Sequence, residues 1–268
     1  MAESGDKNTL TFWEHLDELR GCLIRAAVVT LLCAVAAFFL KDALFGIVLA
    51  PKSPDFVTYR LLEQAGEWVS GGVQPESSRF EVRLINTALT EQFVIHMKTA
   101  VYAGVLCASP YILYLLFRFV SPALYANERR YAVRMVGAGY VMFLTGTLLN
   151  YFLIFPLTLR FLGTYQVSVE VENAITLQSY MDTLLMMSLM MGIVFEIPVL
   201  CWLLARMGVL RAGFMRRYRR HAIVLILTVA AIITPTSDVF TLLMVGMPMW
   251  LLYESSIFIV RGVEGKIH

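Results

Sequence analysis

The sequence predicts an all-α polytopic membrane protein with six transmembrane helices. Hydrophobic residues make up 58% of the 268 positions and charged residues only 16%, a composition too apolar for a soluble domain of this length. The apolar residues also occur in separate runs of bilayer-spanning length, and most charged residues lie between these runs. Together these two observations favour a bundle of membrane helices.

The charged residues delimit six spans within a single membrane domain that covers residues 1–268. We expect the spans at about residues 22–41, 97–118, 134–157, 181–206, 220–234 and 238–260. The first apolar run follows a polar segment and continues past the small residues 34–36, so we interpret it as a retained helix and not as a cleaved signal peptide. No internal repeat divides the chain.

The longest connection, about residues 42–90, surrounds an amphipathic piece near residues 59–69 with prolines and glycines. This pattern predicts a small cap outside the cytoplasm, at one end of a concave bundle. The connection between the last two spans is a tight turn at residues 234–238. In that turn we expect Pro235 to end one helix and Ser237 or Asp238 to cap the next.

The fifth apolar run is short. Only about 12 residues precede Pro235, or about 18 Å of helix, whereas the hydrocarbon core of a bilayer is roughly 30 Å thick. This helix either ends below the membrane surface or lies where the bilayer is locally thinner. The third alternative is a tilted neighbouring helix that packs over an ordinary short helix.

Lysine and arginine indicate the orientation of the chain. If the N-terminus is inside, 15 of the 22 basic residues fall in cytoplasmic segments. Six of the other seven are spread over one long outer loop, where positive charge orients a protein only weakly. An even number of spans places both termini on the same side, so we expect an N-in, C-in topology.

Composition and motifs argue against several functions. A net charge of +2 without a basic stripe does not favour nucleic-acid binding. The four cysteines lack metal or disulfide spacing, the four histidines are scattered, and phosphate-loop, GxSxG and HExxH motifs are absent. We therefore expect no enzymatic activity, no cofactor and no metal site.

Glu196 is the most informative residue, because it lies in an apolar run, residues 183–205, that is otherwise uncharged. It is about 15 Å from Arg206 along a helix and so close to mid-membrane. Carboxyl groups at this depth usually serve function. Pro198 removes a backbone donor and leaves the carbonyl of Val194 free, which should kink the helix. The alternative is a structural hydrogen bond to a neighbouring helix.

Two further carboxylates, Glu18 and Glu128, lie in short arginine-rich segments that the predicted topology places in the cytoplasm. Each could instead serve only a helix terminus or a solvated salt bridge. Carboxylates held at fixed spacing on a rigid face are suited to bind a peptide with two adjacent arginines, because each guanidinium can be bound bidentately.

Three segments carry a resemblance to a known family. The segment FWEHLDELR at residues 12–20 resembles the N-terminal signature of TatC, the receptor subunit of the twin-arginine protein translocase. The segment FVSPALYANERR at residues 119–130 is similar to the first cytoplasmic loop of that family, and FEIP at residues 195–198 is similar to its fourth helix. The resemblance runs from about residue 10 to about residue 260.

The resemblance implies a component of a Sec-independent translocase that binds twin-arginine signal peptides and nucleates assembly for the export of folded proteins. It implies that the signal-peptide contacts are Glu18, Arg20, Phe119, Pro122, Tyr125, Glu128 and Arg130. Glu196 with Pro198 becomes an intramembrane partner site, and Pro51 and Asp238 match outer-face positions implicated in assembly or transport. One departure is Leu242, which stands where some members carry a glutamine.

The implied setting is the bacterial cytoplasmic (inner) membrane, with the proton-motive force as energy source. The implied partners are the single-span proteins TatA and possibly TatB, the signal peptides of cargo, the lipid bilayer and further copies of the chain. The alternative from another class is a small proton-coupled secondary transporter or channel that uses Glu196. Against it, the six runs lack the matching broken helices that transporters commonly carry in two halves.

Overall fold

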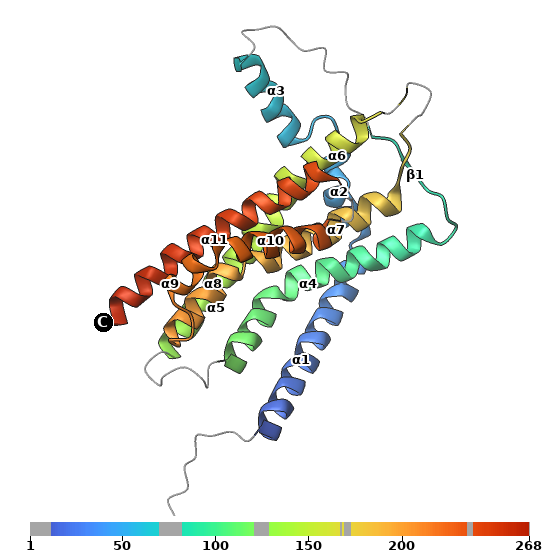
Figure 1. Cartoon of the computed structure of the whole chain (residues 1–268). Coiled ribbons are helices and arrows are strands. Elements are labelled where there is room, and N and C mark those ends of the chain that lie inside the picture. The colour runs from blue at the N-terminus through green and yellow to red at the C-terminus, as the bar shows by residue number, and fades with distance from the viewer. Residues whose placement is uncertain are drawn as a thin grey trace, which may run out of the picture.

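The apolar runs form long helices that lie side by side, with shorter elements gathered at one end (Figure 1). The computed structural model describes residues 12–69, 82–120, 129–166, 168, 173–234 and 238–267. Three long helices are continuous: α1 (Phe12–Phe39), α4 (Glu91–Val120) and α11 (Val239–Ile267). The predicted all-α membrane fold is confirmed.

Two further long helices are interrupted. α5 (Arg129–Leu149) passes through a π-helical turn, η4 (Asn150–Ile154), into α6 (Phe155–Thr164). α7 (Leu177–Val194) ends before Glu196, and α8 (Ile197–Arg206) continues in its place. The second interruption is the kink expected from the proline of α8, which has no N–H for the carbonyl of the preceding turn.

Within the described residues, five helical stretches are long and apolar enough to cross a membrane: Leu16–Phe39, Glu91–Phe119, Met135–Thr164, Leu177–Arg206 and Val239–Gly265. α10 (Arg219–Ile233) has 15 residues, or about 22 Å of helix. It is longer than the 12 residues expected but shorter than the other five. The sixth crossing therefore stays a prediction. The short α9 (Ala212–Arg217) links α8 to α10.

Successive helices, with α10 included, run in opposite directions, which gives the bundle two distinct ends (Figure 1). At one end lie the beginning of α1, the end of α4, the beginning of α5 and the end of α11; we call this the N-terminal end. At the other end lie α2 (Lys41–Val48), α3 (Val57–Val69), α6 and the beginning of α7; we call this the cap end.

Small residues allow the helices to approach closely. A Cβ atom on Gly104 of α4 would lie 2.8 Å from the Cβ of Ala34 in α1, and one on Gly146 of α5 would lie 2.5 Å from the carbonyl oxygen of Met191 in α7. Close backbone contact at small residues is a main source of helix association in membranes. The outer side of α1 leaves Leu32 66% and Phe39 80% exposed, as expected for a surface that faces lipid.

Three tyrosine hydroxyls hold the cap segment against the bundle. Tyr59 in α3 donates to the carbonyl oxygens of Pro51, at 3.1 Å, and Pro156, at 3.2 Å. Tyr151 donates to Ile47 at 2.6 Å, and Tyr180 donates to Val48 at 3.0 Å. Burial raises the pKa of Tyr59 to about 12, so this hydroxyl remains a donor at neutral pH.

A second contact of the cap uses a carbonyl that a proline leaves free. Pro156 lies one turn after Phe152 and has no N–H to donate to it. The hydroxyl of Thr58 in α3 donates to that carbonyl instead. The ring of Phe56 also stacks on Phe152, with centroids 5.8 Å apart. The amphipathic piece predicted near residues 59–69 is thus α3, and its first turn docks on the π-helical turn.

The remaining part of the cap end is a short parallel sheet. β1 (Leu84–Ile85) pairs with β2 (Ile175–Thr176), with Leu84 opposite Ile175. The sheet joins the segment before α4 to the segment before α7, and so it sets these two helix starts beside each other. The predicted cap at one end of the bundle is confirmed.

Candidate functional site

Glu196 lies in the turn between α7 and α8, and only 8% of its surface is exposed. Its carboxyl group faces α5, since a Cβ on Gly139 would lie 3.0 Å from its Oε2 atom. The same position would lie 3.3 Å from the ring of Phe117 in α4. Glycine at position 139 therefore provides the space that the carboxyl group occupies.

One oxygen of this carboxyl group is not satisfied within the protein. The Oε1 atom of Glu196 is buried, and no described residue donates a hydrogen bond to it. A buried acceptor without a donor is costly in an apolar setting. The carboxyl group therefore has a free acceptor position deep in the bundle.

Pro198 lines an apolar pocket of about 620 Å³ on the other side of the same turn. The pocket lies between α5, α8 and α11 and is lined by Met135, Ala138, Met142, Pro198, Val199, Trp202, Ser255 and Ile259. Ala138 and Gly139 are neighbours on α5, so the pocket and the carboxyl group both adjoin this helix. Pro198 thus lines an apolar pocket, and Glu196 is a buried acid that packs against α5 close to it.

The N-terminal end of the bundle brings Glu18 and Phe119 to the same level. α1 and α4 run antiparallel and cross at Ala34 and Gly104. Glu18 lies about four and a half turns before this crossing, and Phe119 lies about four turns after it. Glu18 is half-buried, Arg20 is exposed and Phe119 is half-buried. An acid, a basic side chain and an aromatic ring therefore share this end.

The other predicted signal-peptide contacts cannot be placed as fully. Pro122, Tyr125 and Glu128 lie outside the described residues, and Arg130 is described only as a backbone position in the first turn of α5. The flanking helices α4 and α5 both reach the N-terminal end (Figure 1). Glu18 forms no ion pair with any described residue, so its carboxylate is available to a cationic ligand.

Comparison with known proteins gives the same answer as these motifs. The model of the TatC family, described as the Sec-independent protein translocase protein, matches residues 14–248. The chain belongs to the TatC family. It is 31% identical to the TatC protein of Blattabacterium sp. subsp. Periplaneta americana, over 97% of this chain and 98% of that protein. It is 32% identical to the Aquifex aeolicus TatC protein, over 94% and 95% of the two chains.

Solved structures agree with the sequence relatives. A crystal structure of the twin arginine translocase receptor TatC matches with a TM-score of 0.75 and 30% identity, over 94% of this chain and all of the other. A second TatC crystal structure matches with a TM-score of 0.74. The family membership confirms the resemblance, and it does not favour the alternative of a small proton-coupled transporter.

The two positions that we expected on the outer face of this TatC-family chain have evident structural contacts. Pro51 is buried in the short 3-10 turn η1 (Ala50–Lys52), and its carbonyl oxygen accepts the Tyr59 hydroxyl. Asp238 accepts the N–H of Thr241 at 2.7 Å through its Oδ1 atom and so caps α11, as predicted. Both residues therefore make structural contacts at the cap end.

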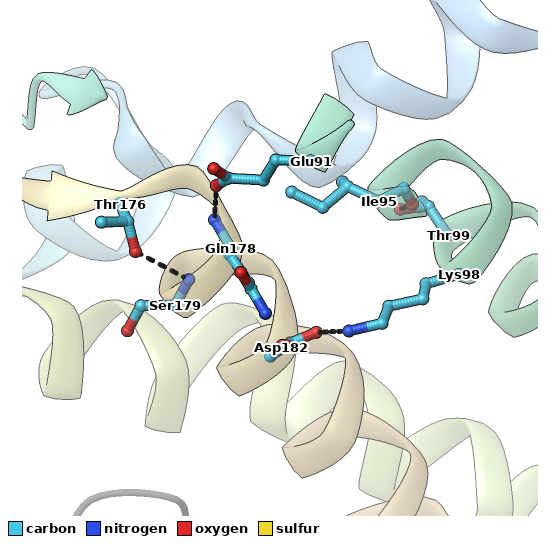
Figure 2. A network of polar contacts seen from close by, with 8 residues as sticks. All are labelled: Glu91, Ile95, Lys98, Thr99, Thr176, Gln178, Ser179 and Asp182. Carbon is cyan, nitrogen blue, oxygen red and sulfur yellow. Dashed lines mark hydrogen bonds and ion pairs between the residues drawn. The ribbon is translucent and has the colours of Figure 1, made fainter. Parts of the chain in front are cut away.

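Glu91 is a buried acid that the sequence analysis did not single out. It begins α4, is 5% exposed and accepts the N–H groups of Thr87 at 2.9 Å and Ala88 at 3.1 Å. Its other oxygen accepts the N–H of Gln178 at 2.8 Å, in the first turn of α7 (Figure 2). One carboxylate therefore satisfies donors at the N-termini of two helices.

A second contact between the same helices lies one to two turns further in. The ammonium group of Lys98 in α4 is 2.7 Å from the carboxylate of Asp182 in α7 (Figure 2). A threonine just before a helix and an acid in its first turn are a recognisable helix-start signal, and Thr90 and Glu91 have that form. The contact with α7 has no local signal, because the partner is distant in sequence.

A polar cluster in the bundle interior also escaped sequence analysis. Asn150, at the start of the π-helical turn, is fully buried and donates to the hydroxyl of Ser188 in α7 at 2.8 Å. The hydroxyl groups of Tyr102 and Thr147 lie beside Ser188. Hydrogen bonds in this cluster join α5 and the π-helical turn to α7, while the hydroxyl of Tyr102 in α4 is buried beside them without a described partner. π-helical turns are frequent at functional positions.

We expect Glu91→Ala to destabilise the protein more than Glu91→Gln. Alanine leaves at least three backbone N–H groups without an acceptor, whereas glutamine keeps one carbonyl oxygen. The midpoint of thermal unfolding in detergent should fall by roughly 5 °C or more for the alanine variant. Glu63→Ala, which removes an exposed acid from α3, is the control and should leave the midpoint unchanged. Equal midpoints for Glu91→Ala and Glu63→Ala would show that the helix-joining contact is not stabilising.

Proposed function

We propose that this chain is the receptor of a twin-arginine translocase and that it binds signal peptides at the N-terminal end of its bundle. The observation that carries the proposal is Glu18, a half-buried carboxylate without a described ion pair, level with Phe119 in a TatC-family fold. Arginine-rich peptides need such an acceptor, because a carboxylate can accept two parallel N–H bonds from one guanidinium.

The remaining predicted contacts complete this site in the proposal. Glu128 supplies the second carboxylate, and Arg20 and Arg130 orient the two acids. Phe119, Pro122 and Tyr125 contact the hydrophobic part of the signal peptide. The positions of Pro122, Tyr125 and Glu128 in the sequence support this arrangement, because all three fall between the end of α4 at Val120 and the start of α5 at Arg129.

The partner site in the proposal is the region around the α7–α8 break. TatA and, where present, TatB would place their single helices against the apolar surface that includes Pro198, and a polar partner side chain would reach Glu196. The apolar pocket of about 620 Å³ supports such a contact. Further copies of the chain would assemble around bound cargo, with the proton-motive force as energy source.

The orientation in the proposal is N-in and C-in, in the bacterial inner membrane. Support comes from the basic residues: the N-terminal end of the bundle carries the arginine-rich segments around α1, α9 and α10. Positive charge close to membrane helices favours the cytoplasmic side. The signal-peptide site and the newly made cargo would then meet on the same side.

A binding experiment with two matched signal peptides tests the receptor assignment. A fluorescent signal peptide with two adjacent arginines is titrated against the purified chain in nanodiscs, beside the same peptide with two lysines. We expect Glu18→Gln and Glu128→Gln each to weaken binding of the arginine peptide by about tenfold or more, since a charge-assisted hydrogen bond contributes about 1.5–3 kcal/mol. The lysine peptide should bind more weakly to the unmodified chain.

Asp17→Asn provides the matched control, because this acid is the exposed neighbour of Glu18 on the same helix turn. It should leave the affinity unchanged. If both glutamate variants bind the arginine peptide as tightly as the unmodified chain, the receptor site lies elsewhere. If instead the glutamate variants fail to express, the two acids serve the helix ends, which is the structural alternative.

A further inference from the structure

The segment from Arg206 to Arg220 has an unusual balance of charge. It contains six arginines and no acid, and it joins the end of α8 to the start of α10. It therefore lies where two helices of the membrane domain meet at the N-terminal end of the bundle (Figure 1). The receptor proposal uses none of these arginines.

The acids that contact this segment are already engaged. Arg219 pairs with Glu254 of α11 at 2.6 Å, and Glu264 of α11 accepts the N–H of Ala212 at 3.0 Å. The guanidinium of Arg206 lies 5.3 Å from the ring centroid of Trp202. The other four arginines are exposed and form no ion pair with a described residue: Arg211, Arg216, Arg217 and Arg220.

The segment is held rigidly against α11 by its apolar side. Ala212 and Met215 of α9 are buried in one cluster with Ile257, Val260 and Val263 of α11. The hydroxyl of Tyr253 donates to the carbonyl oxygen of Met215 at 2.8 Å. Rigid attachment lowers the entropic cost of binding a ligand at the opposite side of the segment.

Aromatic rings lie beside the free arginines. Phe214 is 57% and Tyr218 41% exposed, and their ring centroids are 4.6 Å apart. Exposed aromatic rings and arginines at the end of membrane helices match the layer of lipid headgroups and glycerol groups.

We propose that this face, defined by Phe214, Arg216, Arg217, Tyr218 and Arg220, binds the phosphate of an anionic phospholipid. Arginine is suited to this ligand, because its planar guanidinium donates two parallel N–H bonds to phosphate oxygens. The two rings contact the glycerol and upper acyl region. The inference goes beyond the receptor function and does not depend on it, since it concerns the lipid and not the signal peptide.

Native mass spectrometry of the full chain tests this site. The detergent-solubilised protein is titrated with phosphatidylglycerol and, separately, with phosphatidylcholine. The triple variant R216Q/R217Q/R220Q should bind phosphatidylglycerol about a hundredfold more weakly, at about fivefold for each arginine, with phosphatidylcholine binding unchanged. The triple variant R216K/R217K/R220K should lose much less affinity for phosphatidylglycerol, because lysine keeps the positive charge.

The matched control is K41Q/R60Q/R83Q, which removes three exposed positive charges from the cap end. It should bind phosphatidylglycerol as the unmodified chain does, and inorganic phosphate at the lipid's concentration should not displace the lipid. Equal losses in the two glutamine variants would overturn the proposal in favour of net charge alone. Unchanged lipid binding in R216Q/R217Q/R220Q would also overturn it, and so would displacement by inorganic phosphate.

One further outcome separates a lipid from a protein partner. If R216Q/R217Q/R220Q keeps phosphatidylglycerol but loses an acidic protein that copurifies with the unmodified chain, the face binds protein and the lipid proposal is wrong. Size-exclusion profiles of all variants control for folding, and signal-peptide binding measured on the same samples shows that the receptor site is unaffected.

Discussion

Gly146→Leu is expected to reduce the yield of folded protein to a small fraction of the unmodified level. A Cβ at this position would lie 2.5 Å from the carbonyl oxygen of Met191 and 2.7 Å from the ring of Phe195. The first of these is a backbone atom, so no side-chain rotation relieves the clash, and α5 must move away from α7. The cost should exceed the about 1–3 kcal/mol typical of overpacking a core.

The movement of α5 away from α7 should also disturb the turn between α7 and α8, because Phe195 directly precedes Glu196 in that turn. Gly137→Leu is the matched control: it lies on the same helix, and a Cβ there meets no described atom within 4 Å. The measurement is the monodisperse fraction of a fluorescent fusion in size-exclusion chromatography, followed by thermal unfolding. Comparable yields for the two leucine variants would show that the close crossing of α5 and α7 is not required.

Glu196→Ala is expected to reduce cargo export at least about tenfold, whereas Glu196→Gln should have a mild effect. The buried Oε1 atom has no described donor, so in the proposed function it accepts a hydrogen bond from a partner. Glutamine keeps a carbonyl oxygen at this position, but alanine leaves the partner group unsatisfied in an apolar setting, which costs about 1–3 kcal/mol or more.

Export measured in vesicles with a defined proton-motive force separates three roles for this residue. A role as proton carrier would make both variants severely defective, because neither side chain can ionise. Near-normal export by Glu196→Ala would show that the carboxyl group is only structural. Gly139→Ala adds an independent check, since its Cβ would lie 3.0 Å from Oε2. It should displace the carboxyl group and cause an intermediate defect.

The sequence predicted the fold class and the order of its helices, because burial in a bilayer depends on local hydrophobicity. It also predicted the break at Glu196 and Pro198, since a proline removes a hydrogen bond within its own helix. The cap of α11 by Asp238 and the amphipathic α3 are similarly local. The short distance between Pro235 and the preceding charges predicted a short α10, and the helix begins one residue before the expected span of about 220–234.

Other features depended on contacts between distant parts of the chain. The carboxylate of Glu91 meets Gln178 of another helix, and the hydroxyl of Thr58 meets the carbonyl of Phe152. The π-helical turn at Asn150 was not predicted, although Pro156, which leaves the carbonyl of Phe152 without its helical donor, is a local signal for an irregular helix. A hydrogen bond between residues far apart in the sequence depends on which helices become neighbours, and no single segment encodes that.

The sequence by itself thus determined that the chain crosses a membrane, where the apolar helices lie and which family motifs it carries. Only the tertiary structure decided which side of a helix each functional group faces. Gly139 leaves space for the carboxyl group of Glu196, and Pro198 lines an apolar pocket between α5, α8 and α11. Hydrophobicity is a property of each segment, whereas these placements follow from close packing between helices, which is set by residues from several segments at once.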